Sequence, residues 1–232
     1  MNSRPELKLD WATHQQTSYA CKNWHYSKCV PAGKTVKIGV WENNIFIGVV
    51  VFSGGPSPNI WKTYNLKPIE GAELSRVALT KHISPVTRII SIALKFFRKF
   101  CPGIKLIISY ADKKVGHHGG IYQGGGWIYL GEFGPSFERL FLGKVIHERN
   151  MRQRILDGKN SRDQFKDRPV PPKHKYAIAF TPGLIARLNS ESKPYPKRAS
   201  SKDNVATPDQ GVEGGVNPTD ALQTLDLTIL HI

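Results

Sequence analysis

The stretch from Ile104 to Trp127 concentrates side chains that can do chemistry. Its first part, Ile104–Tyr110, is an apolar run rich in β-branched residues, which predicts a buried strand. Directly after this run come Asp112, two adjacent histidines, a glycine pair, Tyr122 and a glycine triplet. Polar groups and glycines that follow a buried strand are typical of ligand sites in α/β proteins. The alternative is a strand that leads into a solvated turn and a glycine-rich connection.

The hydrophobic pattern indicates the elements that must position these side chains. Residues 34–41 and 46–53 predict a hairpin with its turn at Glu42-Asn43-Asn44, and the second strand is apolar on both faces, as a central strand is. Residues 73–79 predict a third strand. Ser84 as N-cap and Pro85 as first helical residue then predict an amphipathic helix that ends near residue 100. The remaining elements are a long loop over 54–71, a short helix over 116–122, and strands over 127–131 and 176–180; residues 11–20 predict a further helix.

This order predicts an α/β fold with a mixed sheet flanked by helices, in which the helix at 85–100 joins two parallel strands. The order resembles the GNAT acyltransferase fold. That resemblance implies acetyl-CoA as a cofactor, whose pyrophosphate is held by backbone amides before the central helix. The chain lacks a glycine-rich loop there, and the predicted cofactor-binding residues are Thr80, Lys81 and Ser84.

Composition divides the 232 residues into two parts. Residues 1–189 carry about +17 of the net charge and are predicted to form one GNAT-like catalytic and DNA-binding domain. Residues 190–232 carry −2, are rich in Ser, Pro, Gly, Asp and Asn, and predict a disordered tail. No apolar run approaches the ~20 residues that span a bilayer, and no signal peptide is apparent. Three cysteines do not suit a disulfide framework, so we expect a soluble cytosolic protein with no membrane partner.

The formal charge of +15 indicates a polyanionic partner such as nucleic acid. Residues 138–175 alone hold 11 basic and 5 acidic groups, a net +6. Chemistry on a stacked base also requires a pocket with aromatic walls, for which Trp61, Tyr64, Trp127 and Tyr129 are candidates unless they belong to the core. The predicted phosphate-binding residues are Arg149, Arg152, Arg154, Lys159, Arg162 and Lys166.

Five motifs taken in order resemble the phage Mom family over roughly residues 1–180. They are WHYS at 24–27, KIGVW at 37–41, ELSRVAL at 73–79, ISYAD at 108–112, and GHHGGIY at 116–122 with the Trp127 that follows. The resemblance implies an enzyme that converts adenine in double-stranded phage DNA to its carbamoylmethyl form, in the cytoplasm of the infected bacterial host. This modification shields the DNA from host restriction. The motifs place the family's functional residues at His25, Tyr26, Arg76, Asp112 and Tyr122.

The carbamoylmethyl group is attached to adenine through a methylene carbon, which acyl transfer alone does not make. A redox metal such as iron could activate that carbon, and His, Asp and Tyr supply suitable ligands. The predicted iron ligands are His25, Tyr26 and Asp112, although His25 could instead be a hydrogen-bonded wall residue. His117 and His118 are rival ligands, of which one would face the site if both lie on a helix.

The predicted catalytic residues are Arg76, Asp112 and Tyr122. Arg76 is a charge in an apolar strand, which suggests a clamp for a phosphate or carboxylate or, alternatively, a buried ion pair with Glu73 or Asp112. Tyr122 is expected to orient the substrate or to act as an acid or base. Two other functions remain open, an acyltransferase that uses acetyl-CoA on a small amine or protein, and a non-enzymatic DNA-binding protein.

Overall fold

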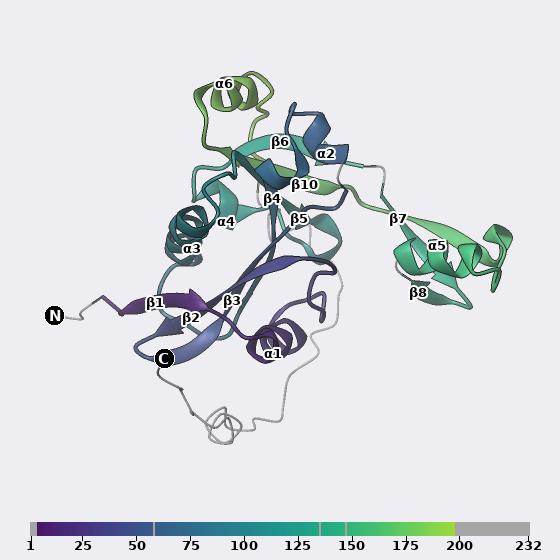
Figure 1. Ribbon diagram of the computed structural model, residues 1–232, viewed down its shortest axis with the longest axis horizontal. Helices are drawn as coiled ribbons and strands as arrows, with labels where there is room; N and C mark the ends of the chain where they lie inside the picture. Colours follow the sequence, from purple (N-terminus) through teal and green to yellow (C-terminus); the bar gives the residue numbers. More distant parts are fainter. Residues whose placement is uncertain (1–3, 58, 135, 147, 198–232) are drawn as a thin grey trace. The chain divides into compact units, whose positions relative to one another are not determined.

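The computed structural model describes residues 4–57, 59–134, 136–146 and 148–197. Its main sheet has seven strands in the order β1-β2-β3-β4-β5-β10-β6 (Figure 1). All neighbours are antiparallel except β4 and β5, which are parallel. The strands are β1 Leu7–Trp11, β2 Thr35–Glu42, β3 Ile45–Ser53, β4 Gly71–Leu79, β5 Leu106–Asp112, β6 Ile128–Phe133 and β10 Lys173–Ala179.

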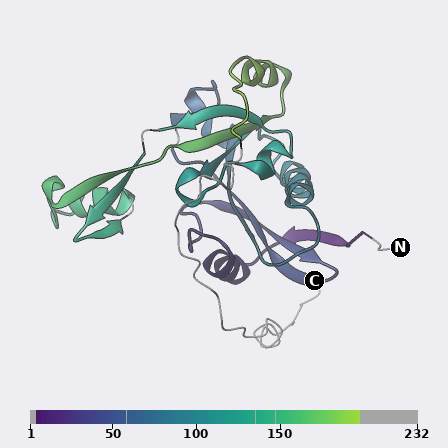
Figure 2. The same ribbon diagram turned by 180° about the vertical axis from the view of Figure 1, so that it is seen from behind.

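Helices cover both faces of this sheet (Figures 1 and 2). On one face lie α3 (Val86–Phe100) and α4 (Gly120–Gln123), which share a core cluster with the inward side chains of β2 to β5. On the other face α1 (His14–Trp24) packs on β3 and β4, while α2 (Asn59–Lys62) and α6 (Pro182–Ser190) cover β5 and β10. The predicted α/β fold, a mixed sheet flanked by helices, is confirmed.

Local sequence explains most of these elements. Asn43 and Asn44 have φ of 50° and 64°, the left-handed conformation that a two-residue hairpin turn requires. In β3, Val50 and Phe52 face the α3 core and Val49 faces the α1 core, so the strand is central, as predicted.

Helix α3 buries one face, with Ile89, Ala93 and Phe97 among the buried residues. It begins one residue later than predicted, with Pro85 rather than Ser84 at the N-cap position. No side chain caps its first turn.

Two segments were predicted incorrectly. Residues 7–11, for which no strand was predicted, form the edge strand β1, and the helix predicted over 11–20 begins only at His14, where Thr13 and Gln16 form a capping box. The expected loop over 54–71 contains α2 and a short 3-10 helix, Pro68–Glu70, and it buries Trp61 completely. In both places the pairing of distant segments overrides a local pattern that reads as polar or loop-like.

The basic region between β6 and β10 folds as a small unit of its own. It has a three-stranded sheet in the order β8-β7-β9, with β7 Ser136–Phe141, β8 Lys144–Ile146 and β9 Phe165–Val170, and the helix α5 Glu148–Leu156. We call this insertion, residues 136–170, the basic lobe. The sequence predicted its charge but not its strands.

Residues 191–197 contact the main sheet. The amide of Lys193 donates to the carbonyl of Tyr129 at 2.8 Å, and the Tyr195 hydroxyl donates to the carbonyl of Trp127 at 2.7 Å. Most of the predicted tail, residues 198–232, lies outside the described residues. Within the described part of the chain, no helix is long and apolar enough to cross a membrane.

Candidate active site at the fork of β4 and β5

The parallel strands β4 and β5 pair over only three residues before they part. Gly71–Glu73 pairs with Leu106–Ile108, after which β4 continues along β3 and β5 continues along β10. A bulge at Ser75 shifts the β3 register, so that Arg76 pairs with Val51 and Leu74 with Phe52. We call the two diverging segments, Glu73–Arg76 and Ser109–Asp112, the fork.

The bulge decides which side chains share a face. In a regular strand, residues 73 and 76 point to opposite faces, because side chains alternate. The extra residue at Ser75 resets the alternation. As a result Leu74 and Val77 both face the α3 core, and Glu73 and Arg76 share the opposite face.

A chain of hydrogen bonds closes the base of the fork. The Ser109 hydroxyl lies 2.7 Å from the Leu74 carbonyl and 2.7 Å from the Tyr122 hydroxyl. A carbonyl can only accept a hydrogen bond, so the single hydroxyl proton of Ser109 is donated to the Leu74 carbonyl. The Tyr122 hydroxyl therefore donates to the Ser109 oxygen. Burial raises the pKa of Tyr122 to about 12, so its phenol is neutral at pH 7. Tyr122 therefore joins the fork from α4.

Arg76 holds the segment that follows α1. Its Nε donates to the carbonyl of Cys29 at 3.2 Å, and its Nη1 donates to the carbonyl of Ser75 at 2.7 Å. The buried ion pair with Glu73 or Asp112 is not formed within 4 Å in the described part of the chain. The guanidinium thus keeps its positive charge uncompensated next to the fork, as an anion clamp requires.

His25 is held beside the fork by its own turn. Its Nδ1 accepts a hydrogen bond from the Ser27 amide at 3.1 Å and lies 2.8 Å from the Ser27 hydroxyl. Because Nδ1 is an acceptor, the neutral ring carries its proton on Nε2. Burial, and then the charge of Arg76, lowers the pKa of His25 to about 4. The ring is therefore neutral at pH 7.

Tyr26 presents its ring to solvent at the same place. It is 43% exposed, stacks on His25 with ring centroids 4.4 Å apart, and meets His117 edge-on at 5.2 Å. Partial burial, and then the charge of Asp112, raises the pKa of Tyr26. His117 and His118 precede α4 rather than lying on a helix, which corrects the prediction for residues 116–119.

Asp112 is the last residue of β5, and both oxygens of its carboxylate contact neighbouring groups. Its Oδ1 accepts from the Lys114 amide at 3.0 Å, and its Oδ2 lies 3.4 Å from the Lys173 ammonium group. The first contact caps the short 3-10 helix Lys113–Val115. Asp112 thus fixes the turn that carries His117, whose amide donates to the Asp112 carbonyl at 3.1 Å.

Glu73 is the acidic group that the sequence reasoning named only as an ion-pair partner. Among the described residues no cation lies within 4 Å of its carboxylate and no hydrogen bond to it forms. Burial raises the pKa of Glu73, and the charges of Arg76 and Lys173 oppose that rise. A second charge in the apolar strand 71–79 was the signal that could have found it.

Two of the three predicted iron ligands, His25 and Asp112, already serve contacts within the chain. Among residues 4–197, outside the three undescribed positions, no three His, Cys, Asp or Glu side chains lie together as a metal site needs. His25 carries its proton on the nitrogen left free by Ser27, and Asp112 is bound to Lys173 and Lys114. Each predicted ligand except Tyr26 therefore already serves a structural contact.

At the predicted pyrophosphate site, the backbone amides are already bonded to other groups of the chain. The amides of Ile83 and Ser84 donate to the two carboxylate oxygens of Glu42, each at 2.8 Å. The Ser84 side chain is 2% exposed, and the Thr80 amide is bonded to the Ile47 carbonyl. Of the predicted cofactor-binding residues, Lys81 alone is exposed.

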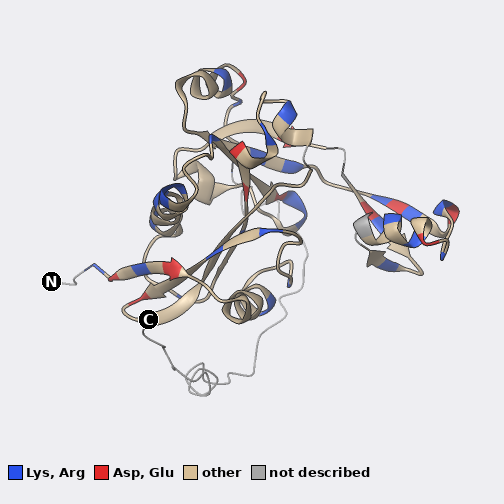
Figure 3. Cartoon of the chain, viewed as in Figure 1, with Lys and Arg blue, Asp and Glu red and all other residues tan. Residues whose placement is uncertain are grey.

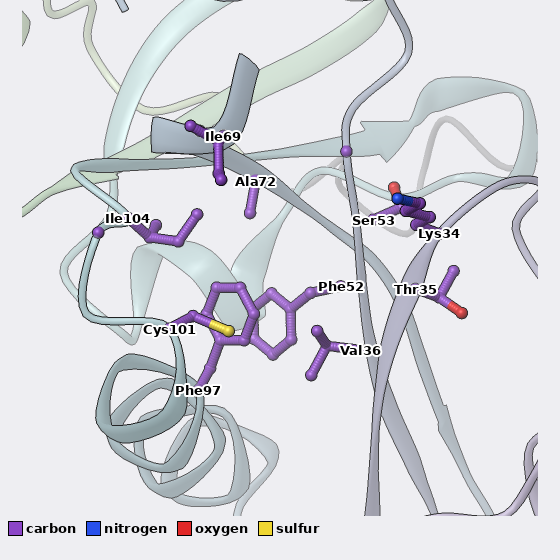
Figure 4. A pocket seen from close by; sticks show the side chains of 13 residues that line it. Lys34, Thr35, Val36, Phe52, Ser53, Ile69, Ala72, Phe97, Cys101 and Ile104 are labelled. Carbon is purple, nitrogen blue, oxygen red and sulfur yellow. The ribbon is translucent and has the colours of Figure 1, made fainter. Parts of the chain in front are cut away.

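The aromatic residues considered as walls of a base pocket belong to the core. All four are at most 6% exposed, and the indole of Trp61 donates to the Gly54 carbonyl. A cavity of about 400 Å³ lies instead near the end of α3, where Phe52 and Phe97 stack at 4.1 Å (Figure 4). It is lined mainly by apolar groups and contains none of the fork residues. The four residues are Trp61, Tyr64, Trp127 and Tyr129.

The predicted phosphate-binding residues all lie in the basic lobe or in the turns between its elements. Acidic groups are interleaved with them (Figure 3). Arg152 pairs with Glu148, Lys159 with Asp157, and Arg162 with Asp167. Arg154 stacks over Phe141, Arg149 lies in α5, and Lys166 is exposed.

Comparison with known proteins assigns the chain to a family. The model of the Mom protein family matches residues 6–197. The chain belongs to the Mom family. It is 26% identical over 185 residues to the methylcarbamoylase mom of Escherichia phage Mu, a match that covers 75% of this chain and 76% of that protein.

Two solved structures are distantly similar to this Mom-family chain. One is FeeM, an N-acyl amino acid synthase from uncultured soil microbes, with a TM-score of 0.44 and 11% identity over 81% of this chain and 95% of that one. The other is a Bacillus subtilis acetyltransferase in complex with CoA, with a TM-score of 0.40 and 10% identity over 77% and 100%. A likeness this distant does not transfer a ligand or a reaction.

Proposed function

We propose that this Mom-family chain is a DNA-modifying transferase that converts adenine in double-stranded DNA to its carbamoylmethyl derivative. The modification would shield phage DNA from restriction inside the infected bacterial host. The observation that carries the proposal is the fork, where a carboxyl with a raised pKa, an uncompensated guanidinium and an exposed aromatic ring occur together. The name of the phage Mu relative, a methylcarbamoylase, supports the transferred group.

Glu73 is the proton acceptor in this proposal. The exocyclic amine of adenine must lose a proton as its nitrogen bonds to the methylene carbon of the donor. The bond between that carbon and the donor's leaving group breaks in the same step, and the leaving group departs with the electron pair. A carboxylate whose pKa is raised toward neutrality accepts a proton more effectively than an ordinary one. Glu73 has that property and, among the described residues, no ion pair that would hold it ionised.

Tyr26 and Arg76 position the reactants. An extruded base needs a flat surface on which to stack, and the exposed Tyr26 ring, itself stacked on His25, supplies one. The Arg76 guanidinium lies close enough to influence the pKa of both Tyr26 and Glu73. It therefore supplies positive potential for the negative charge of a phosphate or of a leaving group.

The basic lobe would bind the DNA backbone. Exposed ion pairs such as Arg152–Glu148 contribute only about 0–1 kcal/mol, so a phosphate can displace the acidic partner at little cost. Lys144 and Lys166 are exposed and form no ion pair in the described part of the chain. The lobe contacts the short 3-10 helix that follows the fork through Lys114, which pairs with Glu138 of β7.

The test is nucleoside mass spectrometry of plasmid DNA from cells that express the full chain. The wild type should yield carbamoylmethyl-adenine, and Glu73→Gln should reduce it at least about 100-fold, the usual contribution of a general base. Unmodified DNA from the wild type, despite soluble protein, would contradict the proposal. Acetylation of another substrate by the same cells would favour the acyltransferase alternative.

The same variant carries its own folding control. Because the folded-state pKa of Glu73 is raised, the ionised carboxylate costs stability as the pH rises above its ordinary value of 4.5. Glu73→Gln should therefore melt at the same temperature as the wild type, or higher, at pH 7, and the difference should shrink toward pH 4. A loss of activity together with a lower melting temperature at pH 7 would point to misfolding instead.

A further inference from the structure

We propose that Glu42 is a built-in anion that occupies the loop amides directly before helix α3, so that the donor substrate is not held by those amides through a diphosphate. This inference concerns the donor and rests on the proposed transferase function. It specifies how the donor is bound, and it distinguishes this chain from enzymes that bind coenzyme A as their donor at this position. The residues present before α3 do not fit the acetyl-CoA that the sequence predicted.

The first step concerns the amides of the loop that leads into α3. Backbone amides that have no partner in a helix or strand bind anions readily, most of all beside the positive end of a helix. Ile83 and Ser84 lie just before Pro85, the N-cap of α3, and this helix has no side-chain cap and no acidic residue in its first turn. The two loop amides must be bonded either by a ligand or by another part of the chain.

The second step is that Glu42 bonds both of these loop amides. The Oε2 atom accepts from Ile83 N and the Oε1 atom from Ser84 N, both at 2.8 Å, so one carboxylate binds two successive amides. This is the way in which a phosphate oxygen pair would be held. Burial alone would raise the pKa of Glu42, but these hydrogen bonds lower it overall. The side chain therefore stays ionised at neutral pH.

The third step is that Glu42 cannot easily move aside. Its backbone ends β2 between two paired neighbours, Leu7 on β1 and Ile45 on β3, and the side chain is 6% exposed. Arg88 of the first turn donates to the Ser84 hydroxyl and to the Pro5 carbonyl. An incoming diphosphate would have to displace a buried carboxylate whose backbone is fixed between two strands and whose oxygens bond the loop before α3.

The consequence is a donor recognised at the fork alone. Two cations next to the reacting centre form no ion pair among the described residues. They are Arg76 and Lys28, which lies on the segment after α1. We infer a donor without a nucleotide diphosphate handle at α3, whose anionic part meets Arg76.

Amide NMR on the full chain tests this directly. Coenzyme A and inorganic diphosphate are titrated to millimolar concentration while the Ile83 and Ser84 amide signals are followed. The wild type should show no saturable shift of either signal. Glu42→Ala, which empties the position, should bind diphosphate at least about tenfold more tightly and shift both signals. Glu6→Gln removes the same charge from the exposed end of the neighbouring strand and should behave as the wild type.

Either of two results would overturn the inference. A saturable shift of both amides by coenzyme A in the wild type would show that the carboxylate gives way. A folded Glu42→Ala variant that gains no anion binding would show that these amides never form an anion site. If Glu42→Ala does not fold, the wild-type titration still decides. DNA modification is measured separately by mass spectrometry, so failure of the proposed function cannot be mistaken for failure here.

Discussion

At the scale of single residues, the site depends on side chains whose charge or exposure departs from the ordinary. Tyr26 is a large aromatic residue left 43% exposed beside a buried, neutral histidine. Its hydroxyl and its ring support different roles. A metal ligand or acid needs the hydroxyl, whereas a stacking surface needs only the ring.

Tyr26→Phe and Tyr26→Ala distinguish these roles. We expect Tyr26→Phe to keep most of the DNA modification, since the stack on His25 survives, and Tyr26→Ala to lose about 10- to 100-fold, in line with ~1–3 kcal/mol for base stacking. Modified adenine is quantified by mass spectrometry against soluble protein. An equal loss of DNA modification in both variants would assign the function to the hydroxyl, and would support Tyr26 as a metal ligand or an acid.

At the scale of elements, the fork and the basic lobe have separate tasks. The fork arises because β4 and β5 pair for three residues only and Ser75 bulges. The lobe is inserted between β6 and β10 and contacts the 3-10 helix after the fork at Lys114. Chemistry and backbone binding therefore occupy different elements, and variants of the lobe should leave the chemistry of the fork intact.

Replacing Lys144 and Lys166 together with Ala tests the lobe. If both contact phosphates, the slope of log Kd against log salt concentration should fall by about 2, and binding should weaken equally for unrelated sequences. Lys8→Ala with Lys95→Ala removes the same charge from β1 and α3 and should change the slope much less. Gel-shift titration at several salt concentrations provides the measurement. Equal effects of the two pairs would mean that only net charge matters.

At the scale of the whole molecule, charge is distributed unevenly along the chain. Residues 198–232 hold 2 basic and 5 acidic groups, so the part before them carries +18 against +15 for the whole. The family match also ends at residue 197. We therefore expect the DNA-binding charge and the fold to lie before residue 198.

Two truncations check this expectation. Ending the chain at residue 197 should preserve the melting temperature and DNA modification, and should not weaken DNA binding. Ending it at residue 189 also removes the Tyr195 and Lys193 hydrogen bonds to the main sheet, which should lower stability by roughly 1–3 kcal/mol. Loss of soluble protein on removal of 198–232 alone would show that this part contributes to the fold.

The sequence by itself determined the elements whose cause is local. The hairpin turn at Asn43-Asn44, the central strand β3 and the amphipathic face of α3 follow from backbone preferences and apolar periodicity within a few residues. The motif match also indicated the set of residues around the site, although not their roles. His25, Tyr26, Arg76 and Tyr122 do gather at the fork or beside it.

Only the tertiary structure decided what those residues can do, because their environments come from distant parts of the chain. Glu42 bonds the loop before α3 from 41 residues away, and Arg76 bonds a carbonyl 47 residues away. The bulge at Ser75 exists only because β4 must pair with β3, and it places Glu73 and Arg76 on one face. A pattern within one segment carries no record of such pairings, so it could neither identify Glu73 as an acid without an ion pair nor show that the amides of Ile83 and Ser84 are bonded by Glu42.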